Sequence, residues 1–323
     1  MSMRWNDCRQ AARRGQLTHQ QLLRLLEAQA AKGHWRRISR WLPTLIRNGI
    51  TPGERQGSAI ALAAWLQRQR QAGLAQELLN LVDWAYADAN AWLLRGQVAL
   101  SNHQTQLAEC HLIRALVLPD GQATAAYRLG QLNRSRGQFD AAASWFLAAL
   151  SCDPEPFHIH NELQFTRCSE TLLPELVSFY EALCQQEPKR ALVRQLLSHY
   201  LMRQGDGKRA INESRQAARL ELGPLTQQLA PAETKPTAPD FLILGVPKGG
   251  TTAVLRWLAH VPGLWCHPRK ELNFFDGRYS YGPDWYCAQF PRFQDGAGIL
   301  RGEATPNYFC HPETAARVAA LMP

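Results

Sequence analysis

The chain has 323 residues, of which 46% are hydrophobic and 20% charged, and its formal net charge is +9. This is the composition of an ordinary globular protein, and the length leaves room for two domains. No run approaches the ~20 apolar residues of a membrane helix, so we expect no membrane span. The residues after Met1 hold no apolar stretch typical of a signal peptide. No dense basic run interleaved with aromatic residues occurs, so no nucleic-acid partner is expected.

The positive charge is unevenly distributed along the chain. The stretch from Phe241 to Pro323 contains 8 basic and 6 acidic residues, a net charge of +2, which leaves +7 on residues 1–240. An excess of positive charge favours acidic partners, including sulfated or uronic-acid polysaccharides. A well-solvated helical surface rich in arginine accounts for the same charge, and both interpretations stay open.

The eight cysteines show no metal-binding or disulfide pattern. None forms C-x-x-C, and no Cys/His group has zinc-finger spacing, so we expect no metal site. Scattered thiols beside apolar residues are typical of a reducing cytosol, so the sequence predicts a cytoplasmic protein. The cysteines are Cys8, Cys110, Cys152, Cys168, Cys184, Cys266, Cys287 and Cys310.

Small residues recur with a period of 34 in the first two thirds of the chain. The pairs are Gly96 and Gly130, Ala108 and Ala142, and Ala115 and Ala149, and two further periods lead to Ala210 and Ala217. Together with Trp92 and Pro154, the pattern W-x₃-G … A-x₆-A … P resembles the tetratricopeptide repeat, a pair of antiparallel helices. Small residues let neighbouring helices approach closely, and large ones fill the space between them. We expect about six helix pairs between residues 20 and 222.

This helical solenoid defines the first predicted domain, residues 1–222. A repeat array carries no reaction chemistry by itself, and its concave face commonly binds a partner protein. We therefore expect a docking surface, with a rigid spacer as the alternative. Residues 223–240 contain four prolines and read as a semi-rigid linker to a third region, residues 241–323.

The third region opens with a hydrophobic strand that runs into a glycine-rich turn, Phe241–Thr252. A helix follows at once, with apolar residues spaced over Ala253–His260. Glycines let backbone N–H groups approach a phosphate, and a helix N-terminus adds partial positive charge. The turn therefore predicts a phosphate site. The residues that we expect to bind the phosphate are Lys248, Gly249, Gly250, Thr251 and Thr252.

The order of residues in this turn separates two kinds of phosphate loop. The nucleotide-triphosphate loop places its lysine after the last glycine, whereas Lys248 precedes the glycine pair. P-K-G-G-T-T instead resembles the 5′-phosphosulfate loop of sulfotransferases that use 3′-phosphoadenosine 5′-phosphosulfate (PAPS). Lys270–Asp276 with Gly282–Tyr286 resembles the K-E-x-x-F-F-D … G-x-x-W-Y pattern of the carbohydrate-directed members, the heparan-sulfate group in particular. Arg301–Tyr308 resembles the G-E-x-[ST]-P-x-Y stretch that follows.

The resemblance implies the first part of a P-loop-like parallel α/β domain, so the whole chain is expected to be α + α/β. It implies transfer of a sulfuryl group from PAPS to a hydroxyl or amine, most often on a carbohydrate, without a metal. Lys248 would stabilise the leaving phosphate and Glu271 would be the general base. Lys270 and Asn273 would contact the acceptor, and Lys270 would alternatively steady Glu271. The aromatic residues of these motifs, and Tyr308, are expected to form core and wall.

Some positions differ from the better-known animal enzymes. Asn273 stands where several of them carry histidine, and Ala304 where many carry lysine, so the acceptor stays open. Tyrosine-directed sulfotransferases typically carry arginine and serine in place of Lys248 and Gly249, which favours a sugar acceptor. A nucleotide-triphosphate kinase is a further alternative, and it requires an acidic strand end for Mg²⁺.

The resemblance covers only about the last quarter of the chain. In the family, the next element is a strand that ends in an arginine, with a serine after it, and these hold the 3′-phosphate of the nucleotide. The sequence stops at Val318–Pro323, where that strand would begin. We therefore expect either a fragment of a longer enzyme or a truncated product. A non-catalytic repeat scaffold with an inactive sulfotransferase remnant is the alternative function.

Overall fold

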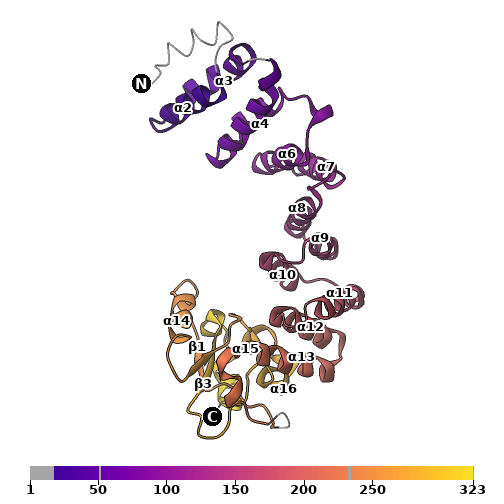
Figure 1. Ribbon diagram of the computed structural model, residues 1–323, viewed down its shortest axis with the longest axis vertical. Coiled ribbons are helices and arrows are strands. Elements are labelled where there is room, and N and C mark those ends of the chain that lie inside the picture. Colours follow the sequence, from indigo (N-terminus) through magenta and orange to yellow (C-terminus); the bar gives the residue numbers. More distant parts are fainter. Residues whose placement is uncertain (1–17, 51, 232–233, 323) are drawn as a thin grey trace. The chain divides into compact units, whose positions relative to one another are not determined.

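The computed structural model describes residues 18–50, 52–231 and 234–322. Contacts divide the chain into two compact units, Met1–Cys168 and Ser169–Pro323, which are described separately below (Figure 1). The first is entirely helical in its described part. The second combines helices with a small parallel sheet.

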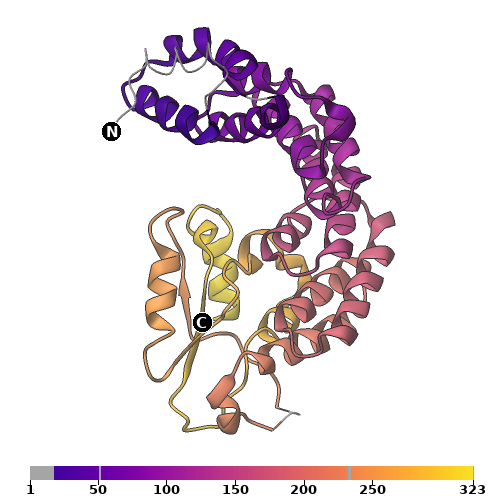
Figure 2. The ribbon, with the colours of Figure 1, turned by 45° about the horizontal axis from the view of Figure 1, so that its top comes forward.

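The first unit is a succession of helices, most of which pack on their neighbours along the chain (Figure 2). The helices α2 to α6 share one apolar core, to which Leu22, Ile38, Leu62 and Val98 contribute fully buried side chains. The bounds are α2 His19–Ala30, α3 Trp35–Gly49, α4 Pro52–Arg68, α5 Ala72–Leu79, α6 Ala89–Ser101, α7 Thr105–Leu116, α8 Gln122–Ser135, α9 Phe139–Cys152 and α10 Phe157–Gln164, with a short 3₁₀ helix at Trp84–Tyr86.

Glycines allow the paired helices of this unit to approach closely. A Cβ atom on Gly130 of α8 would lie 2.6 Å from the ring of Phe146 on α9, and one on Gly96 of α6 would lie 2.9 Å from Leu112 on α7. No side chain fits at such distances, so each glycine makes room for the large residue sixteen positions later. The recurring small residues therefore have the role that the 34-residue period predicted.

The second unit begins with three more helices of the same kind. They are α11 Leu173–Gln186, α12 Ala191–Gln204 and α13 Gly207–Leu220, preceded by a 3₁₀ turn at Glu170–Leu172. Ala210 and Ala217, predicted by the period, are fully buried on α13. The helix α12 ends at Gly205, whose φ of 91° is the left-handed conformation that terminates many helices.

The proline-rich segment after α13 is attached to a later part of the chain. It starts with a 3₁₀ helix at Gly223–Gln228. The N–H of Ala230 then donates to the carbonyl oxygen of Arg292 at 2.9 Å, and the N–H of Gln294 donates to that of Gln228 at 2.9 Å. The segment is therefore held by backbone hydrogen bonds to residues 292–294.

A three-stranded parallel sheet forms the centre of the remaining chain. Its order is β1-β3-β2, with β1 Phe241–Ile243, β2 Leu264–Cys266 and β3 Leu300–Ala304. Strand β1 is three residues shorter than the predicted strand, which extended to Val246, and it lies at an edge of the sheet. The surrounding helices are α14 Thr251–Leu258, α15 Phe274–Gly277, α16 Pro283–Cys287 and α17 Thr314–Leu321, with 3₁₀ turns at Tyr279–Tyr281 and Pro306–Phe309.

Helix α16 and the residues directly after it contact the last helix pair, α12 and α13, through buried polar groups. The indole N–H of Trp285 donates to Ser198 Oγ on α12 at 2.9 Å, and the side-chain amide of Gln289 donates to Ser214 Oγ on α13 at 2.7 Å. Ser198 Oγ in turn donates to the carbonyl oxygen of Ala210 at 2.7 Å. The last helix pair therefore contributes hydrogen-bond partners to the core of the second unit.

The observed architecture confirms the expected fold class, a helical array followed by a parallel α/β region. The predicted domain bounds at residues 222 and 240 stay predictions. Within the described residues, no helix is both long and apolar enough to cross a bilayer.

Candidate functional site

The sequence motifs meet at the carboxyl edge of the sheet. The register pairs Ile243 of β1 with Ala304 of β3, so both strands end at the same level. The N–H of Glu271 donates to the carbonyl oxygen of Ala304 at 2.9 Å, which brings the K-E-x-x-F-F-D segment to the same edge. In open parallel α/β sheets this edge is where ligands bind.

The predicted phosphate loop has a strained and exposed backbone. Lys248 has a φ of 66° and Gly250 a φ of 85°, both in the left-handed region. The N–H of Gly249 donates to the carbonyl oxygen of Val246 at 2.9 Å, and a Cβ atom on Gly249 would lie 2.9 Å from the Val246 side chain. Glycine is therefore required at position 249 by a close approach and favoured at position 250 by its dihedral angle.

This loop presents positive groups that the chain does not itself neutralise. Gly250 caps helix α14 without a side-chain hydrogen bond, and Thr251 is the first helical residue. Across the described residues, no intrachain acceptor is found for the N–H groups of Gly250, Thr251 and Thr252, and no carboxylate pairs with Lys248. Free N–H groups at a helix N-terminus beside an exposed ammonium fit a phosphate group. The residues predicted for this role therefore suit it.

Glu271 and Lys270 form an ion pair at the same edge. Lys270 Nζ lies 2.7 Å from Glu271 Oε1, and 43% of the Glu271 side chain is exposed. Of the two contacts expected for Lys270, the structure shows the one with Glu271. An exposed carboxylate with one cationic partner can still be reached by an acceptor substrate, as a general base must be. An ordinary ion pair on the protein surface has the same geometry. No hydrogen bond or ion pair joins Glu271 to Lys248 in the described part of the chain.

Asn273 has a hydrogen-bond acceptor without a partner. Its Oδ1 is buried and receives no hydrogen bond from any described residue. Its backbone is again left-handed, with a φ of 53°, and its N–H donates to Thr305 Oγ1 at 3.3 Å. A buried acceptor with no partner is costly, so a ligand that donates to Oδ1 would be favoured. This suits the predicted contact with an acceptor.

The aromatic residues of the motifs are buried, as expected. Phe274 stacks on Tyr286 with ring centroids 4.3 Å apart, and Trp285 and Tyr308 are almost fully buried around them. Ala304 is also fully buried and packs with Leu255 of α14 and Cys266 of β2. Position 304 therefore lies in the small core under the loop and offers no ionic contact to an acceptor.

Sequence reasoning assigned no role to Glu303, which is the most deeply buried carboxylate of this region. It is fully buried on β3, and burial raises the pKa of its carboxyl group, while hydrogen bonds from three hydroxyls act in the opposite direction. Tyr308 and Thr305 each donate to it at 2.7 Å, and Tyr286 donates at 3.1 Å. The signal available in the sequence was a lone acid inside an otherwise uncharged G-E-A-T-P run.

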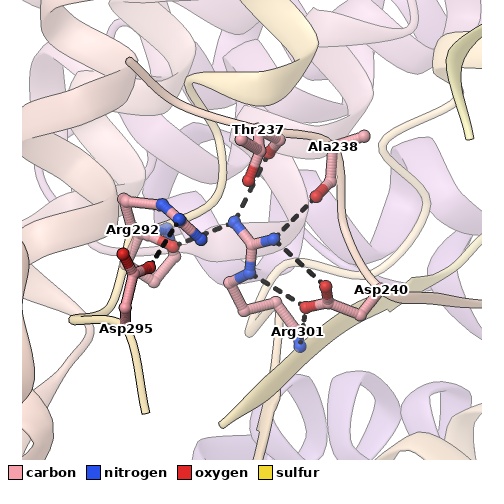
Figure 3. Close-up of polar contacts among 7 residues, drawn as sticks. Thr237, Ala238, Asp240, Arg292, Asp295 and Arg301 are labelled. Atoms are coloured by element: carbon pink, nitrogen blue, oxygen red, sulfur yellow. Dashed lines mark hydrogen bonds and ion pairs between the residues drawn. The ribbon is translucent and has the colours of Figure 1, made fainter. Parts of the chain in front are cut away.

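A second unassigned residue, Arg301, anchors the chain before β1 (Figure 3). Its guanidinium is buried and bonds both carboxylate oxygens of Asp240, at 3.0 and 3.3 Å, and the carbonyl oxygen of Ala238 at 2.7 Å. Two backbone hydrogen bonds join the same two residues. The N–H of Asp240 donates to the carbonyl oxygen of Arg301, and the N–H of Arg301 donates to the Asp240 carboxylate, each at 2.7 Å. This clamp fixes where β1 starts beside β3, and hence where the predicted phosphate loop begins.

Two further observations concern the remaining predictions. The seven cysteines of the described part are free thiols, and Cys8 lies outside it. The described residues contain no group of three or more His, Cys, Asp or Glu side chains placed to hold a metal ion. The cytoplasmic location stays a prediction.

Comparison with known proteins points to one class of enzyme. The chain is 36% identical over 85 residues to the membrane-associated sulfotransferase kil1 of Dictyostelium discoideum, which covers 26% of this chain and 18% of that protein. It is 38% identical over 101 residues to human heparan sulfate glucosamine 3-O-sulfotransferase 3A1, covering 31% and 24%. With human heparan sulfate glucosamine 3-O-sulfotransferase 6 it shares 40% identity over 85 residues, covering 26% and 24%. The chain carries a sulfotransferase-like segment.

The chain spans about a fifth to a quarter of the length of these relatives. No protein-family model matches it. Among solved structures it is similar to YrrB, described as a tetratricopeptide protein with an unusual peptide-binding site, with 18% identity and a TM-score of 0.39 over 53% of this chain and 88% of that one. MamA AMB-1 gives 17% identity and a TM-score of 0.35 over 51% and 98%. Scores at this level carry no functional argument.

Proposed function

We propose that the sulfotransferase-like segment, residues 241–323, binds the 5′-phosphosulfate end of PAPS and supports sulfuryl transfer to a hydroxyl or amine of a carbohydrate. One observation carries the proposal. The free N–H groups and ammonium of the Lys248–Thr252 loop lie at the same sheet edge as the Glu271 carboxylate. Two of the similar proteins are heparan sulfate glucosamine 3-O-sulfotransferases, which supports the choice of a carbohydrate.

The loop residues have separate tasks in this proposal. Gly249 and Gly250 bring the backbone close to the phosphate, and Thr251 and Thr252 donate hydrogen bonds to it from the first turn of α14. Lys248 neutralises the charge that develops on the phosphate as the sulfuryl group leaves. When bound, PAPS supplies the activated sulfuryl group.

The acceptor side is assigned to the segment after β2. One carboxylate oxygen of Glu271 accepts the proton of the acceptor hydroxyl or amine as that group attacks. Lys270, 2.7 Å away, steadies the carboxylate before the acceptor arrives. Asn273 Oδ1 is a buried atom with no partner among the described residues. It accepts a hydrogen bond from a second hydroxyl or amine of the carbohydrate substrate. The repeats are proposed as a docking surface for a partner protein.

The kinase alternative is disfavoured by the surroundings of Glu303. This residue does supply an acid near the end of β3, where such an enzyme would hold Mg²⁺. Its two oxygens, however, are buried and already accept hydrogen bonds from Tyr286, Thr305 and Tyr308. The loop also has its lysine before the glycines. The repeat scaffold with an inactive remnant is the remaining alternative, and it predicts no donor binding.

Donor binding is tested by calorimetric titration of the 323-residue chain with 3′-phosphoadenosine 5′-phosphate. We expect a micromolar dissociation constant, weakened about tenfold or more by Lys248→Ala because a charge-assisted phosphate contact is lost. Lys208→Ala, an exposed lysine on α13, is the matched control and should change nothing. Absence of binding by folded wild-type chain, or unchanged binding by Lys248→Ala, would overturn the donor site.

The base is tested separately by Glu271→Gln. We expect sulfuryl transfer to a heparan-type oligosaccharide to fall about 10²- to 10⁴-fold, the range for loss of a general base. Nucleotide affinity should stay unchanged, because the donor loop is untouched. Full turnover by the variant would remove Glu271 from the mechanism. A wild-type chain that binds the nucleotide without turnover would support the donor site but overturn sulfuryl transfer by this chain.

A further inference from the structure

The segment that carries the candidate base has an unfavourable backbone conformation. Glu271 and Asn273 both have left-handed φ values, 65° and 53°, which residues with a side chain rarely adopt. Such a conformation persists only where surrounding contacts hold it. What holds these residues also decides where the Glu271 carboxylate lies.

Two hydroxyls hold the backbone directly after Glu271. The N–H of Asn273 donates to Thr305 Oγ1 at 3.3 Å, and the N–H of Phe274 donates to the hydroxyl oxygen of Tyr308 at 2.9 Å. Both hydroxyls belong to the third sequence motif, which starts on β3. The motif at Arg301–Tyr308 therefore fixes the backbone of the motif at Lys270–Asp276.

The hydroxyls can accept these bonds because their own protons are directed elsewhere. Each hydroxyl has a single proton, and Glu303 accepts both of them, from Thr305 at Oε2 and from Tyr308 at Oε1, each at 2.7 Å. Glu303 is fully buried and has no ion-pair partner anywhere in the described chain. A buried acid with two acceptor oxygens suits this arrangement, whereas an amide would present a donor to one of the hydroxyls.

We propose that Glu303 is a positioning residue for Glu271, acting through Thr305 and Tyr308 on the backbone of Asn273 and Phe274. The inference rests on the proposed role of Glu271 as base. It assigns the buried carboxylate to orientation of the acceptor side of the site, with no contact to donor or acceptor.

Tyr286 provides a matched control within the same network. Its hydroxyl also donates to Glu303 Oε1, at 3.1 Å, and its ring stacks on Phe274. No hydrogen bond links this hydroxyl to the backbone of residues 271–274 in the described chain. Tyr286→Phe and Tyr308→Phe therefore remove the same chemical group from the same carboxylate oxygen, but only the second variant releases the segment that carries Glu271.

The kinetic test compares the two variants in the 323-residue chain. We expect Tyr308→Phe and Glu303→Gln to lower turnover at saturating substrate about 10- to 100-fold, the effect of a misplaced catalytic group. Tyr286→Phe should keep wild-type turnover. Affinity for 3′-phosphoadenosine 5′-phosphate should be unchanged in all three. Melting temperatures should fall in both tyrosine variants, and further in Tyr308→Phe because the Phe274 N–H also loses its acceptor. Equal losses of turnover in these two would show that the network is merely structural and overturn the proposal.

Amide-resolved hydrogen exchange tests the positioning without any turnover. We expect the Phe274 amide to exchange about tenfold faster in Tyr308→Phe than in wild type, and at the wild-type rate in Tyr286→Phe. Unchanged protection in Tyr308→Phe would overturn the proposal. If wild-type chain shows neither nucleotide binding nor turnover, the proposed function fails, yet the exchange comparison still decides whether Glu303 orders this segment.

Discussion

The helix pairs of the first unit and the last pair of the second unit solve the same packing problem with different residues. In α8 and α9, Gly130 makes room for Phe146, and in α6 and α7, Gly96 makes room for Leu112. The equivalent positions in α12 and α13, two periods after α8 and α9, hold Ser198 and Ser214, which contact each other at 2.7 Å.

This substitution changes what the helix pair can bind. A glycine facing a large apolar residue allows the two helices to pack through apolar contacts alone. Two serines instead place hydroxyl groups between the helices, and these need hydrogen-bond partners. Trp285 and Gln289 of the sulfotransferase-like segment supply them by donating to the two serines. The comparison indicates that the same repeat position is used for apolar stacking in the first unit and for attachment of the segment in the second.

The largest effect on this comparison is expected from Phe146→Ala. Phe146 is fully buried against Gly130, and removing a buried aromatic side chain costs about 3–5 kcal/mol. Segment-resolved hydrogen exchange in urea should show this loss in the first unit. Phe139→Ala, on the same helix but 39% exposed, is the control and should cost much less. Equal losses would mean that the glycine–phenylalanine contact does not organise the unit.

A smaller effect is expected from Ser198→Ala. The change leaves the buried Trp285 indole N–H without its partner, and a buried unsatisfied group costs about 1–3 kcal/mol. The Ala210 carbonyl lies inside α13 and keeps its helical hydrogen bond. Urea unfolding of the second unit should report a loss of about 1–3 kcal/mol on that basis.

Ser151→Ala is the control for this prediction, because the hydrogen bond that Ser151 Oγ makes among the described residues is to the carbonyl oxygen of Leu147 within its own helix. We expect little change in stability. A Ser198→Ala chain as stable as wild type would show that the polar contacts do not attach the segment to the last helix pair.

The last predicted effect is a pH dependence that arises from buried histidines in both units. Burial lowers the pKa of His111 to about 4 and that of His267 to about 3, with the charge of Arg95 and that of Arg269, respectively, acting in the same direction. Below pH ~6.5 the unfolded chain therefore binds protons that the folded chain does not. Each histidine should lower stability by about 1.4 kcal/mol per pH unit on acidification towards its folded pKa.

The measurement is the urea midpoint of each unit between pH 6.5 and 4.5. His111→Gln should flatten the pH dependence of the first unit only. His267→Gln should reduce that of the second only, where burial also lowers the pKa of His199 and leaves part of the slope. His260→Gln, an exposed histidine near the end of α14, should leave both slopes unchanged. A slope that persists unchanged in both buried-histidine variants would assign the acid sensitivity to other groups.

Much of the fold was predictable because its signals are local. The 34-residue spacing of glycine and alanine indicates where helices approach closely. Each such position requires a small residue, so the sequence shows the requirement position by position. The proposed phosphate loop rests on equally local signals, since Lys248, the two glycines and the start of α14 are consecutive residues. The strand before the loop was predicted too long, because the apolar residues Leu244 and Val246 continue the pattern although pairing with β3 stops at Ile243.

The helical array, the glycine-rich turn and the identities of the candidate groups follow from the sequence alone, because periodicity and short motifs express local backbone requirements. Only the tertiary structure decided that Glu303 reaches Thr305, Tyr308 and Tyr286 together, and that Arg301 clamps Asp240. The same holds for Ser198, whose Oγ accepts a hydrogen bond from the indole N–H of Trp285, 87 residues away in the sequence. A buried polar group is satisfied by whatever the fold brings next to it, and no spacing in the sequence specifies that neighbour.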